Sequence, residues 1–185
     1  MAQVSLLNQL SENDFRASML LCCGSTLWVQ RMCSQRPFAS TLHLSACADW
    51  CWWTLPESEW REAFLAHPRI GGNIESLREK FKGSGASAPS PSWEGEEQSG
   101  TKHADEAVLR GLADGNEEYE GRFGHVFLIC ATGKSADEML EALRARRHNT
   151  PQQELLIAAG EQAKIAQLRI AKIISALETT GLSRL

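Results

Sequence analysis

The sequence predicts an all-α protein, a single-domain helical bundle with a long C-terminal helix. Apolar residues recur at helical spacing through most of the chain, and capping signals precede several of these segments. Only the run 126–131 resembles a strand, and a single strand has no partner for its backbone groups. The chain of 185 residues is long enough for one domain, predicted over residues 1–180, with a tail at 181–185.

Two helices are expected near the N-terminus, each with a hydroxyl side chain at its start. The first follows Ser11, and its apolar side carries Phe15, Met19, Leu20 and Cys23. The second begins at Ser40 or Thr41. Its apolar positions repeat at i, i+3, i+4 and i+7, which are Leu44, Cys47, Ala48 and Cys51. Core or interface packing is expected of the tryptophans at its end, Trp50, Trp52 and Trp53.

Two further helices are expected in the middle of the chain. One is short, from about Pro56 to Ala66, and has two aromatic residues four positions apart, Trp60 and Phe64. The other spans roughly 102–120, with three apolar residues near one line, Val108, Leu112 and Tyr119. Between them, the residues from Lys82 to Ser92 are glycine, serine, alanine and proline with one lysine, which predicts a flexible loop.

Capping boxes predict the starts of the last two helices. Ser135 and Glu138 form one such box, followed by the apolar residues Met139, Leu140 and Leu143. Thr150 and Gln153, on either side of Pro151, form a second for the longest helix, which is expected to run to about Glu178. Its apolar stripe consists of Leu155, Ala159, Ala166, Ile170, Ile173 and Leu177.

Charge and cysteine usage exclude several classes of protein. The net charge is −4 and the pI about 5.8, so neither nucleic acid nor an anionic membrane surface is an expected partner. The chain shows no secretory signal, and no apolar run approaches the ~20 residues of a membrane span. We therefore expect reduced, mostly buried thiols. Cys47 and Cys51 would share a helix face, but no second ligand pair accompanies them, and no metal site is predicted.

The stretch "VFLICATGKS" has the outline of a phosphate-binding loop, an apolar run followed by Gly-Lys-Ser at the start of a helix. Such a loop needs a first glycine five residues before the second. Leu128 occupies that place, and the nearest upstream glycine, Gly124, is four residues too early. The capping box at Ser135 accounts for the same residues, so a degenerate nucleotide site is only an alternative.

Three charged or titratable features could carry chemistry, and each also has an ordinary structural explanation. Pro68 disfavours helix for the residue before it, so His67 projects at a helix end, where it could simply cap the free carbonyls. The acidic run 94–97 could be a solvated surface segment. Arg169 stands among apolar residues of the last helix and could extend its head group past the edge of the core.

Five segments in order resemble the 2-oxo-4-hydroxy-4-carboxy-5-ureidoimidazoline (OHCU) decarboxylase family, which closes the route from urate to allantoin. They are "CCGSTLWVQRM" with "RPF", "HPRIGG", "EEQSG", "YEGRFGHVFLICATGKSADEMLEAL" and "EQAKIAQLRIAKI". The resemblance implies a cofactor-independent decarboxylase that releases (S)-allantoin, with His67 as the catalytic histidine and Glu97 as its carboxylate partner. It also implies a set of substrate-binding residues: Pro68, Glu94, Gln98, Phe127, Leu128, Ile129, Cys130, Ala131 and Arg169.

One position departs from the family pattern, which has a serine three residues before the glutamate of Glu-Gln. Glu94 stands there, and Ser92 lies two residues further back. The family also suggests a homodimer, and urate oxidase and hydroxyisourate hydrolase as functional partners, the hydrolase being a separate protein. The alternative from another class is a non-catalytic helical interaction module, for which His67 would be dispensable.

The last three residues, Ser183-Arg184-Leu185, resemble the Ser-Lys-Leu signal for peroxisomal import, with arginine in place of lysine. The tail is expected to leave the last helix near Gly181, which would make the signal accessible. A peroxisomal location is therefore expected, and a cytoplasmic one if the signal is not used.

Overall fold

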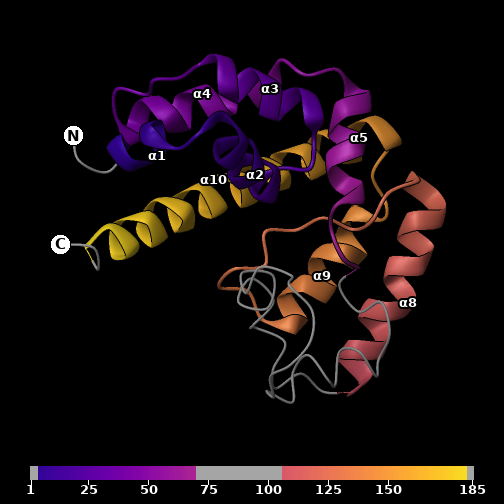
Figure 1. The fold of residues 1–185 in the computed structure, drawn as a ribbon. Helices are drawn as coiled ribbons and strands as arrows, with labels where there is room; N and C mark the ends of the chain where they lie inside the picture. The colour runs from indigo at the N-terminus through magenta and orange to yellow at the C-terminus, as the bar shows by residue number, and fades with distance from the viewer. Residues whose placement is uncertain (1–3, 70–105, 183–185) are drawn as a thin grey trace. The chain divides into compact units, whose positions relative to one another are not determined.

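The structure is a computed structural model that describes residues 4–69 and 106–182 (Figure 1). Every regular element within these ranges is a helix, which confirms the all-α class. The chain forms two compact units. The terminal unit consists of Met1–Ala66 with Gln162–Leu185, and the central unit is His67–Glu161.

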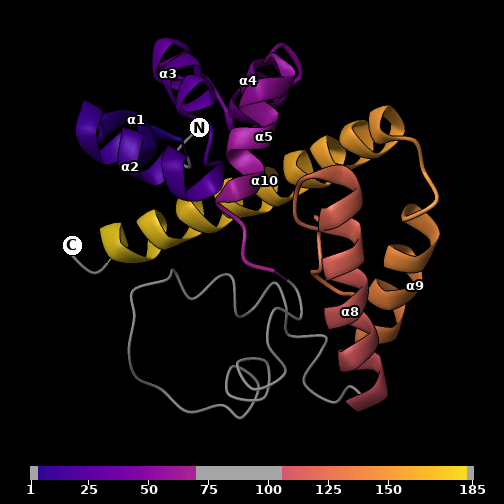
Figure 2. The same cartoon turned by 90° about the vertical axis from the view of Figure 1, so that its right-hand side faces the viewer.

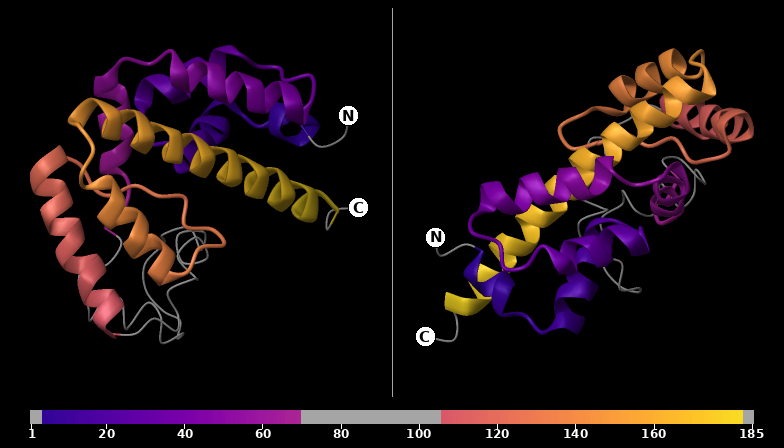
Figure 3. Two further views of the ribbon diagram at one scale, coloured as in Figure 1. Left: turned by 180° about the vertical axis from the view of Figure 1, so that it is seen from behind. Right: turned by 90° about the horizontal axis from the view of Figure 1, so that it is seen from above.

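The terminal unit contains five helices from the start of the chain and the C-terminal part of the longest helix (Figures 1 and 3). They are α1 (Ser5–Gln9), α2 (Glu12–Cys22), α3 (Thr26–Ser34), α4 (Thr41–Trp53), α5 (Glu57–Leu65) and α10 (Pro151–Leu182). The sequence pattern does not predict α1 and α3. Both are short, with 5 and 9 residues, so each offers few repeats of the helical period.

The predicted caps of the terminal unit are present. The hydroxyl of Ser11 accepts a hydrogen bond from the N–H of Asp14, and the hydroxyl of Ser40 accepts one from the N–H of His43. Each cap satisfies an amide of the first helical turn that has no partner within the helix. Pro56 occupies the N-cap position of α5, directly before its first helical residue.

The predicted apolar faces of α2, α4 and α5 are buried, with one correction in α2. Leu20 is 53% exposed, and Cys22 lies in the core with Phe15 and Met19 instead. The buried residues of α2 follow the spacing i, i+4, i+7, and Leu20 lies one position, about 100° of rotation, from Met19. Of the three tryptophans at the end of α4, only Trp52 is in the core, and the other two, Trp50 and Trp53, are exposed.

The terminal part of α10 is fastened to α4 by Gln167. Its side-chain N–H groups donate to the Ser45 carbonyl at 3.0 Å and to Oδ1 of Asp49 at 2.8 Å, and its oxygen accepts from the Ser45 hydroxyl at 2.8 Å. The predicted stripe of α10 is buried except at Leu177, which is partly exposed. The helix continues through Gly181 to Leu182, past its expected end near Glu178.

The central unit contains α8 (Glu106–Phe123), α9 (Ala136–Arg146) and the first turns of α10. Helices α8 and α9 lie side by side (Figure 2). Their shared core consists of Leu112, Tyr119, Phe123, Phe127, Ile129, Ala131, Ala136, Met139, Leu140 and Leu143. Both predicted capping boxes are present, at Ser135 with Glu138 and at Thr150 with Gln153.

The run 126–131 does not form the strand that it resembles. It is an irregular, buried segment between α8 and α9, here called the 126–131 segment. Its odd-numbered residues from Phe127 to Ala131 join the shared core of α8 and α9, whereas Leu128 and Cys130 are buried outside that group. This alternation is typical of extended chain, in which successive side chains point to opposite sides.

Candidate active site

His67 and Pro68 follow the end of α5, as the sequence predicted. The helix stops at Leu65, and the N–H of Ala66 donates to the carbonyl of Ala63 at 3.2 Å. His67 is half-buried, and its Nε2 atom is removed from solvent. A partly enclosed imidazole suits the transfer of a proton to a small molecule near neutral pH.

A close approach fixes the residue that precedes His67. Gly24, in the turn between α2 and α3, lies so near Ala66 that a Cβ atom at position 24 would stand 2.5 Å from the Cβ of Ala66. Any larger residue there would have to push Ala66 away. Glycine in "CCGSTLWVQRM" therefore has a packing role against Ala66, the residue before the "HPRIGG" segment.

Two carboxylates of α5 bind the first turn of α3. Glu59 accepts from the hydroxyl of Ser25 at 2.7 Å and from the N–H of Leu27 at 3.3 Å. Glu62 accepts from the hydroxyl of Thr26 at 2.8 Å. The Ser25 hydrogen bond is the main cause that holds the pKa of Glu59 below its ordinary value. Two carboxylates at the positive end of α3 thus join it to α5.

Arg69 anchors the end of residues 67–69, here called the histidine motif. Its Nε donates to Oε1 of Glu120 at 2.7 Å, and its Nη2 donates to Oε2 of the same carboxylate. Such a two-pronged pair fixes orientation as well as distance. Because Glu120 lies in the last turns of α8, the pair ties "HPRIGG" to "YEGRFG" within the central unit.

The backbone of the 126–131 segment is held by side chains instead of by a neighbouring strand. Nη1 of Arg146 donates to the carbonyl of Leu128 at 2.7 Å, and Oε2 of Glu161 accepts from the N–H of Cys130 at 2.7 Å. A buried backbone group without a partner would be costly. These bonds explain how a non-helical segment is stable in the middle of an all-α unit.

Arg146 belongs to a buried polar network around Glu154, a side chain with no exposure. Its Nε and Nη2 lie 2.8 and 2.5 Å from Oε1 of Glu154, and its guanidinium stands 4.6 Å from the ring centroid of Phe127. The Tyr119 hydroxyl donates to the same Oε1, and Nδ2 of Asn149 donates to Oε2 at 2.7 Å. Burial, and then Glu154, raise the pKa of Tyr119, which keeps its hydroxyl a donor.

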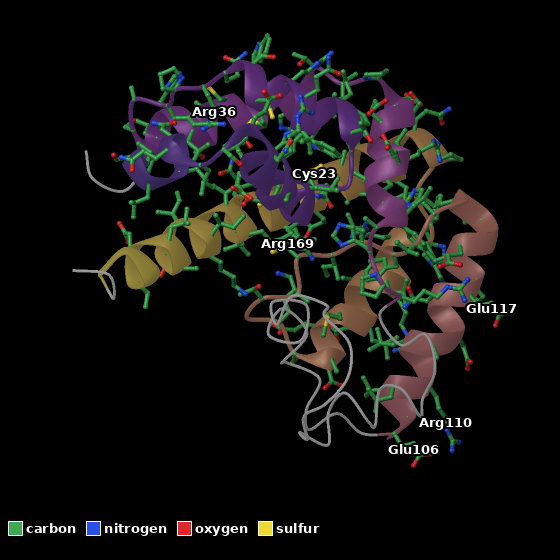
Figure 4. All side chains as sticks on the ribbon, in the orientation of Figure 1. Cys23, Arg36, Glu106, Arg110, Glu117 and Arg169 are labelled. Carbon is green, nitrogen blue, oxygen red and sulfur yellow. The ribbon has the colours of Figure 1, made fainter. Side chains whose placement is uncertain are left out.

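Arg169 lies in the terminal unit and is buried, with 7% exposure, so it does not extend past the core edge into solvent. Its Nη1 donates to the carbonyl of Leu21 at 3.0 Å, at the C-terminal end of α2. Cys23 lies close to it (Figure 4). Burial raises the pKa of the Cys23 thiol to about 12, and the Arg169 charge opposes part of that rise.

The predicted site residues divide into three groups. His67, Pro68 and Phe127–Ala131 belong to the central unit, and Arg169 belongs to the terminal unit. The third group, Glu94, Glu97 and Gln98, lies outside the described residues, as do Ser92, the 82–92 loop and Ser183-Arg184-Leu185. The sequence pattern does not single out Arg69, Glu120, Arg146 or Glu161, since an isolated charge carries no periodic signal.

The Gly-Lys-Ser stretch forms the turn and cap of α9. Gly133 has φ +79°, a conformation that favours glycine. The Ser135 hydroxyl accepts from the N–H of Glu138 at 3.2 Å, and the Glu138 carboxylate accepts from the N–H of Ser135 at 2.6 Å. The latter bond is the main cause that lowers the pKa of Glu138. An ionised carboxylate thus lies at the helix N-terminus, where a phosphate would otherwise bind.

Five of the six free cysteines are buried, as predicted, and Cys33 is partly exposed. Across residues 4–69 and 106–182, no three His, Cys, Asp or Glu side chains are grouped so that they could hold a metal ion. No helix in those ranges has both the length and the apolar character that a membrane crossing requires.

A model of the family described as OHCU decarboxylase matches residues 8–171 of the chain. The chain is also similar to the uric acid degradation bifunctional protein TTL of Arabidopsis thaliana, with 35% identity over 168 residues. That match covers 90% of the chain and 48% of the relative, so the chain spans about half the length of this plant protein.

Two further similarities cover most of both proteins. A 2-oxo-4-hydroxy-4-carboxy-5-ureidoimidazoline decarboxylase of Amia calva is 32% identical over 142 residues, 76% of either protein. A crystal structure of OHCU decarboxylase in the presence of (S)-allantoin superposes with a TM-score of 0.65 and 33% identity. That superposition covers 84% of the chain and 96% of the solved structure.

Proposed function

The chain belongs to the OHCU decarboxylase family, and on that premise we propose that it removes CO₂ from 2-oxo-4-hydroxy-4-carboxy-5-ureidoimidazoline and releases (S)-allantoin. The bond between the ring carbon and its carboxylate breaks, and CO₂ leaves. The electron pair stays on the ring side, where the conjugated ring accepts it. A proton then adds to that carbon. Because the substrate ring itself accepts the electron pair, the reaction requires no electron-accepting cofactor.

The protein's part in this reaction is to orient the carboxylate out of the ring plane and to deliver one proton to one face. His67 is the proposed proton-transfer residue, since its imidazole is half-buried directly after α5. Glu97 is proposed to orient the imidazole or to bind the polar groups of the ring, as a carboxylate can hold one histidine tautomer. Delivery to a single face would give the (S) product.

The observation that carries the proposal is the open backbone edge of the 126–131 segment. Leu128 and Cys130 make the hydrogen bonds to Arg146 and Glu161. The N–H and C=O of Ile129 make no hydrogen bond to any residue that the structure describes, although Ile129 is buried. In extended chain, neighbouring residues direct these groups to opposite edges. An adjacent donor and acceptor match the N–H and C=O groups of a cyclic ureide.

The direct test is to supply the freshly made product of hydroxyisourate hydrolase and to follow the circular dichroism of allantoin. We expect the wild-type protein to accelerate formation of the (S) signal over the spontaneous reaction, which gives no excess of one hand. His67→Asn should reduce the rate by about 10²–10⁴-fold, the usual contribution of an acid–base group. Wild-type turnover in His67→Asn would refute the role of the histidine.

The carboxylate partner is tested by comparing two neighbours outside the described residues. Glu97→Gln should impair turnover much more than Glu96→Gln, because only Glu97 occupies the family position. If the two glutamates merely form a solvated acidic run, both changes should have small and equal effects. Small and equal effects would remove Glu97 from the proposed site.

The finer parts of the proposal concern assembly and location. We propose a homodimer, supported by the exposed Trp50 and Trp53 on α4, and sedimentation equilibrium of wild type and Trp53→Glu would test it. Hydroxyisourate hydrolase, acting after urate oxidase, would supply the substrate. Import into peroxisomes is supported by the tripeptide Ser183-Arg184-Leu185 alone. A fluorescent fusion at the N-terminus, with and without these residues, would test it.

A further inference from the structure

Arg146 has no freedom to shift without breaking several contacts at once. Its Nη1 holds the Leu128 carbonyl, its other donors hold Glu154, and its planar group stacks on Phe127. The Glu154 carboxylate is in turn fixed by Tyr119 and Asn149. A fully satisfied buried network of this kind is rigid, since each donor and acceptor depends on the others.

Glu161 supplies a second anchor on the same helix. It lies seven residues after Glu154, two helical turns along one face of α10. Glu161 accepts directly from the Cys130 N–H, whereas Glu154 acts on the Leu128 carbonyl through Arg146. The segment is thus tied to the first turns of α10 at two backbone groups, one donor and one acceptor.

We propose that Arg146 and Glu161 are positioning residues for catalysis, which set the place of the open Ile129 edge against the substrate. This inference rests on the proposed function, in which that edge binds the ureide. Neither side chain needs to touch the substrate. Their bonds to Leu128 and Cys130 occupy one edge of the segment and so leave the opposite edge for the ligand.

A positioning role and a purely structural role predict changes in different kinetic constants, KM for the first and apparent kcat for the second. Loss of folded protein lowers the apparent kcat and leaves KM unchanged, because the remaining molecules are normal. Displacement of the binding edge in a folded protein raises both KM for the substrate and Kd for (S)-allantoin. A displacement of about 1 Å can reduce the rate on the order of 10²-fold.

The first experiment replaces Arg146 with lysine, which keeps the charge for Glu154 but loses the planar fork. We expect Arg146→Lys to raise KM and the Kd of (S)-allantoin together by about tenfold, the loss of affinity that one lost hydrogen bond to the ligand produces. The matched control is Arg147→Lys, one residue further, whose partner Glu118 is at the surface. It should leave both constants near their wild-type values.

The second experiment changes Glu161, and it keeps the inference testable if Arg146→Lys does not fold. Glu161→Ala removes the acceptor for the Cys130 N–H, whereas Glu161→Gln retains an oxygen at that place. We expect a raised KM and Kd in the alanine variant and recovery in the glutamine variant. Both are measured on protein shown to be folded by circular dichroism and by its melting curve.

Unchanged KM and Kd in folded Arg146→Lys and Glu161→Ala, with an active wild type, would overturn the inference and leave the proposed function intact. A wild-type protein that neither forms (S)-allantoin nor binds it would overturn the proposed function, and this inference with it. If both variants show an unchanged KM and an apparent kcat that falls only in proportion to the folded fraction, the two residues serve stability alone and the inference is overturned.

Discussion

Arg69 and Glu120 form a two-pronged ion pair that joins the residue next to Pro68 to the last turns of α8. Glu120 is adjacent in sequence to Tyr119, whose ring packs 5.3 Å from that of Phe127. The pair therefore connects the histidine motif to the helix that supports the 126–131 segment. Arg69 is 54% exposed and Glu120 19%, so the pair is expected to contribute modestly to stability.

The first prediction is that the Arg69–Glu120 pair matters more for the position of the histidine motif than for the stability of the protein. Arg69→Ala should lower the free energy of unfolding by about 1 kcal/mol or less, yet kcat/KM should fall by about tenfold or more because the histidine motif loses its anchor. Steady-state kinetics and urea unfolding measure the two effects. The exchanged pair, Arg69→Glu with Glu120→Arg, should recover part of the activity, and no recovery would argue against the pair as the cause.

The second prediction concerns the contact between Gly24 and Ala66. Gly24→Ala places a Cβ atom within 2.5 Å of Ala66, so it should destabilise the fold by roughly 1–3 kcal/mol. Activity should also fall, because His67 follows Ala66. The control is Gly160→Ala in α10, where a new Cβ meets nothing within 4 Å. That change should raise the melting temperature slightly, since alanine favours helix by up to about 1 kcal/mol.

The third prediction is a pH dependence at Glu59. Its folded pKa lies below the ordinary 4.5, so its contribution is present above that value and is lost as pH falls through the folded pKa. Glu59→Gln should therefore be less stable than wild type at pH 7 by roughly 1 kcal/mol. The difference should shrink below pH 4.5, where wild type also loses its charge. Urea unfolding at both pH values measures it, and a constant difference would contradict the assignment.

The fourth prediction concerns the thiols. Burial raises the pKa of Cys23 to about 12 and that of Cys51 to about 11, so both stay protonated at pH 8. A thiol-specific disulfide reagent should label Cys33 first in the native protein, because the other five cysteines are buried. Mass spectrometry locates the label, and unfolding in urea should make all six sites reactive. Fast labelling of Cys23 in folded protein would contradict the burial described above.

The fifth prediction separates the family function from nucleotide binding. The Glu138 carboxylate accepts the hydrogen bond of the Ser135 N–H, so this N–H is not available to a phosphate. ATP with Mg²⁺ should therefore not raise the melting temperature. A bound nucleotide at about 100 times its Kd would stabilise by about 2.7 kcal/mol, which a melting curve detects readily. Lys134→Ala should leave turnover close to wild type. A clear shift with ATP would restore the phosphate-loop interpretation.

Local signals made much of this fold predictable. The caps at Ser11, Ser40 and Ser135 depend on residues three positions apart, and the sequence shows such pairs directly. The apolar faces of α4 and α10 repeat over several turns, so their period is clear. The position of His67 was predictable for the same reason, because proline constrains its immediate neighbour.

The parts that could not be predicted depend on residues far apart in the chain. The 126–131 segment resembles a strand, and only the side chains of Arg146 and Glu161 explain why it needs no strand beside it. The Arg69–Glu120 pair joins residues 51 positions apart. No periodicity reports such a pairing, and composition alone gives every arginine the same set of candidate partners.

The division of α10 between two compact units has a consequence for protein synthesis. The terminal unit needs Gln162–Leu185 to complete its core, and the whole of His67–Glu161 emerges from the ribosome before that segment does. The apolar faces of α2 and α4 therefore stay exposed until Gln162–Leu185 has been synthesised. The central unit is contiguous and can fold first. Chaperones that shield nascent apolar surface are thus expected to act on the N-terminal helices, even though those helices are made first.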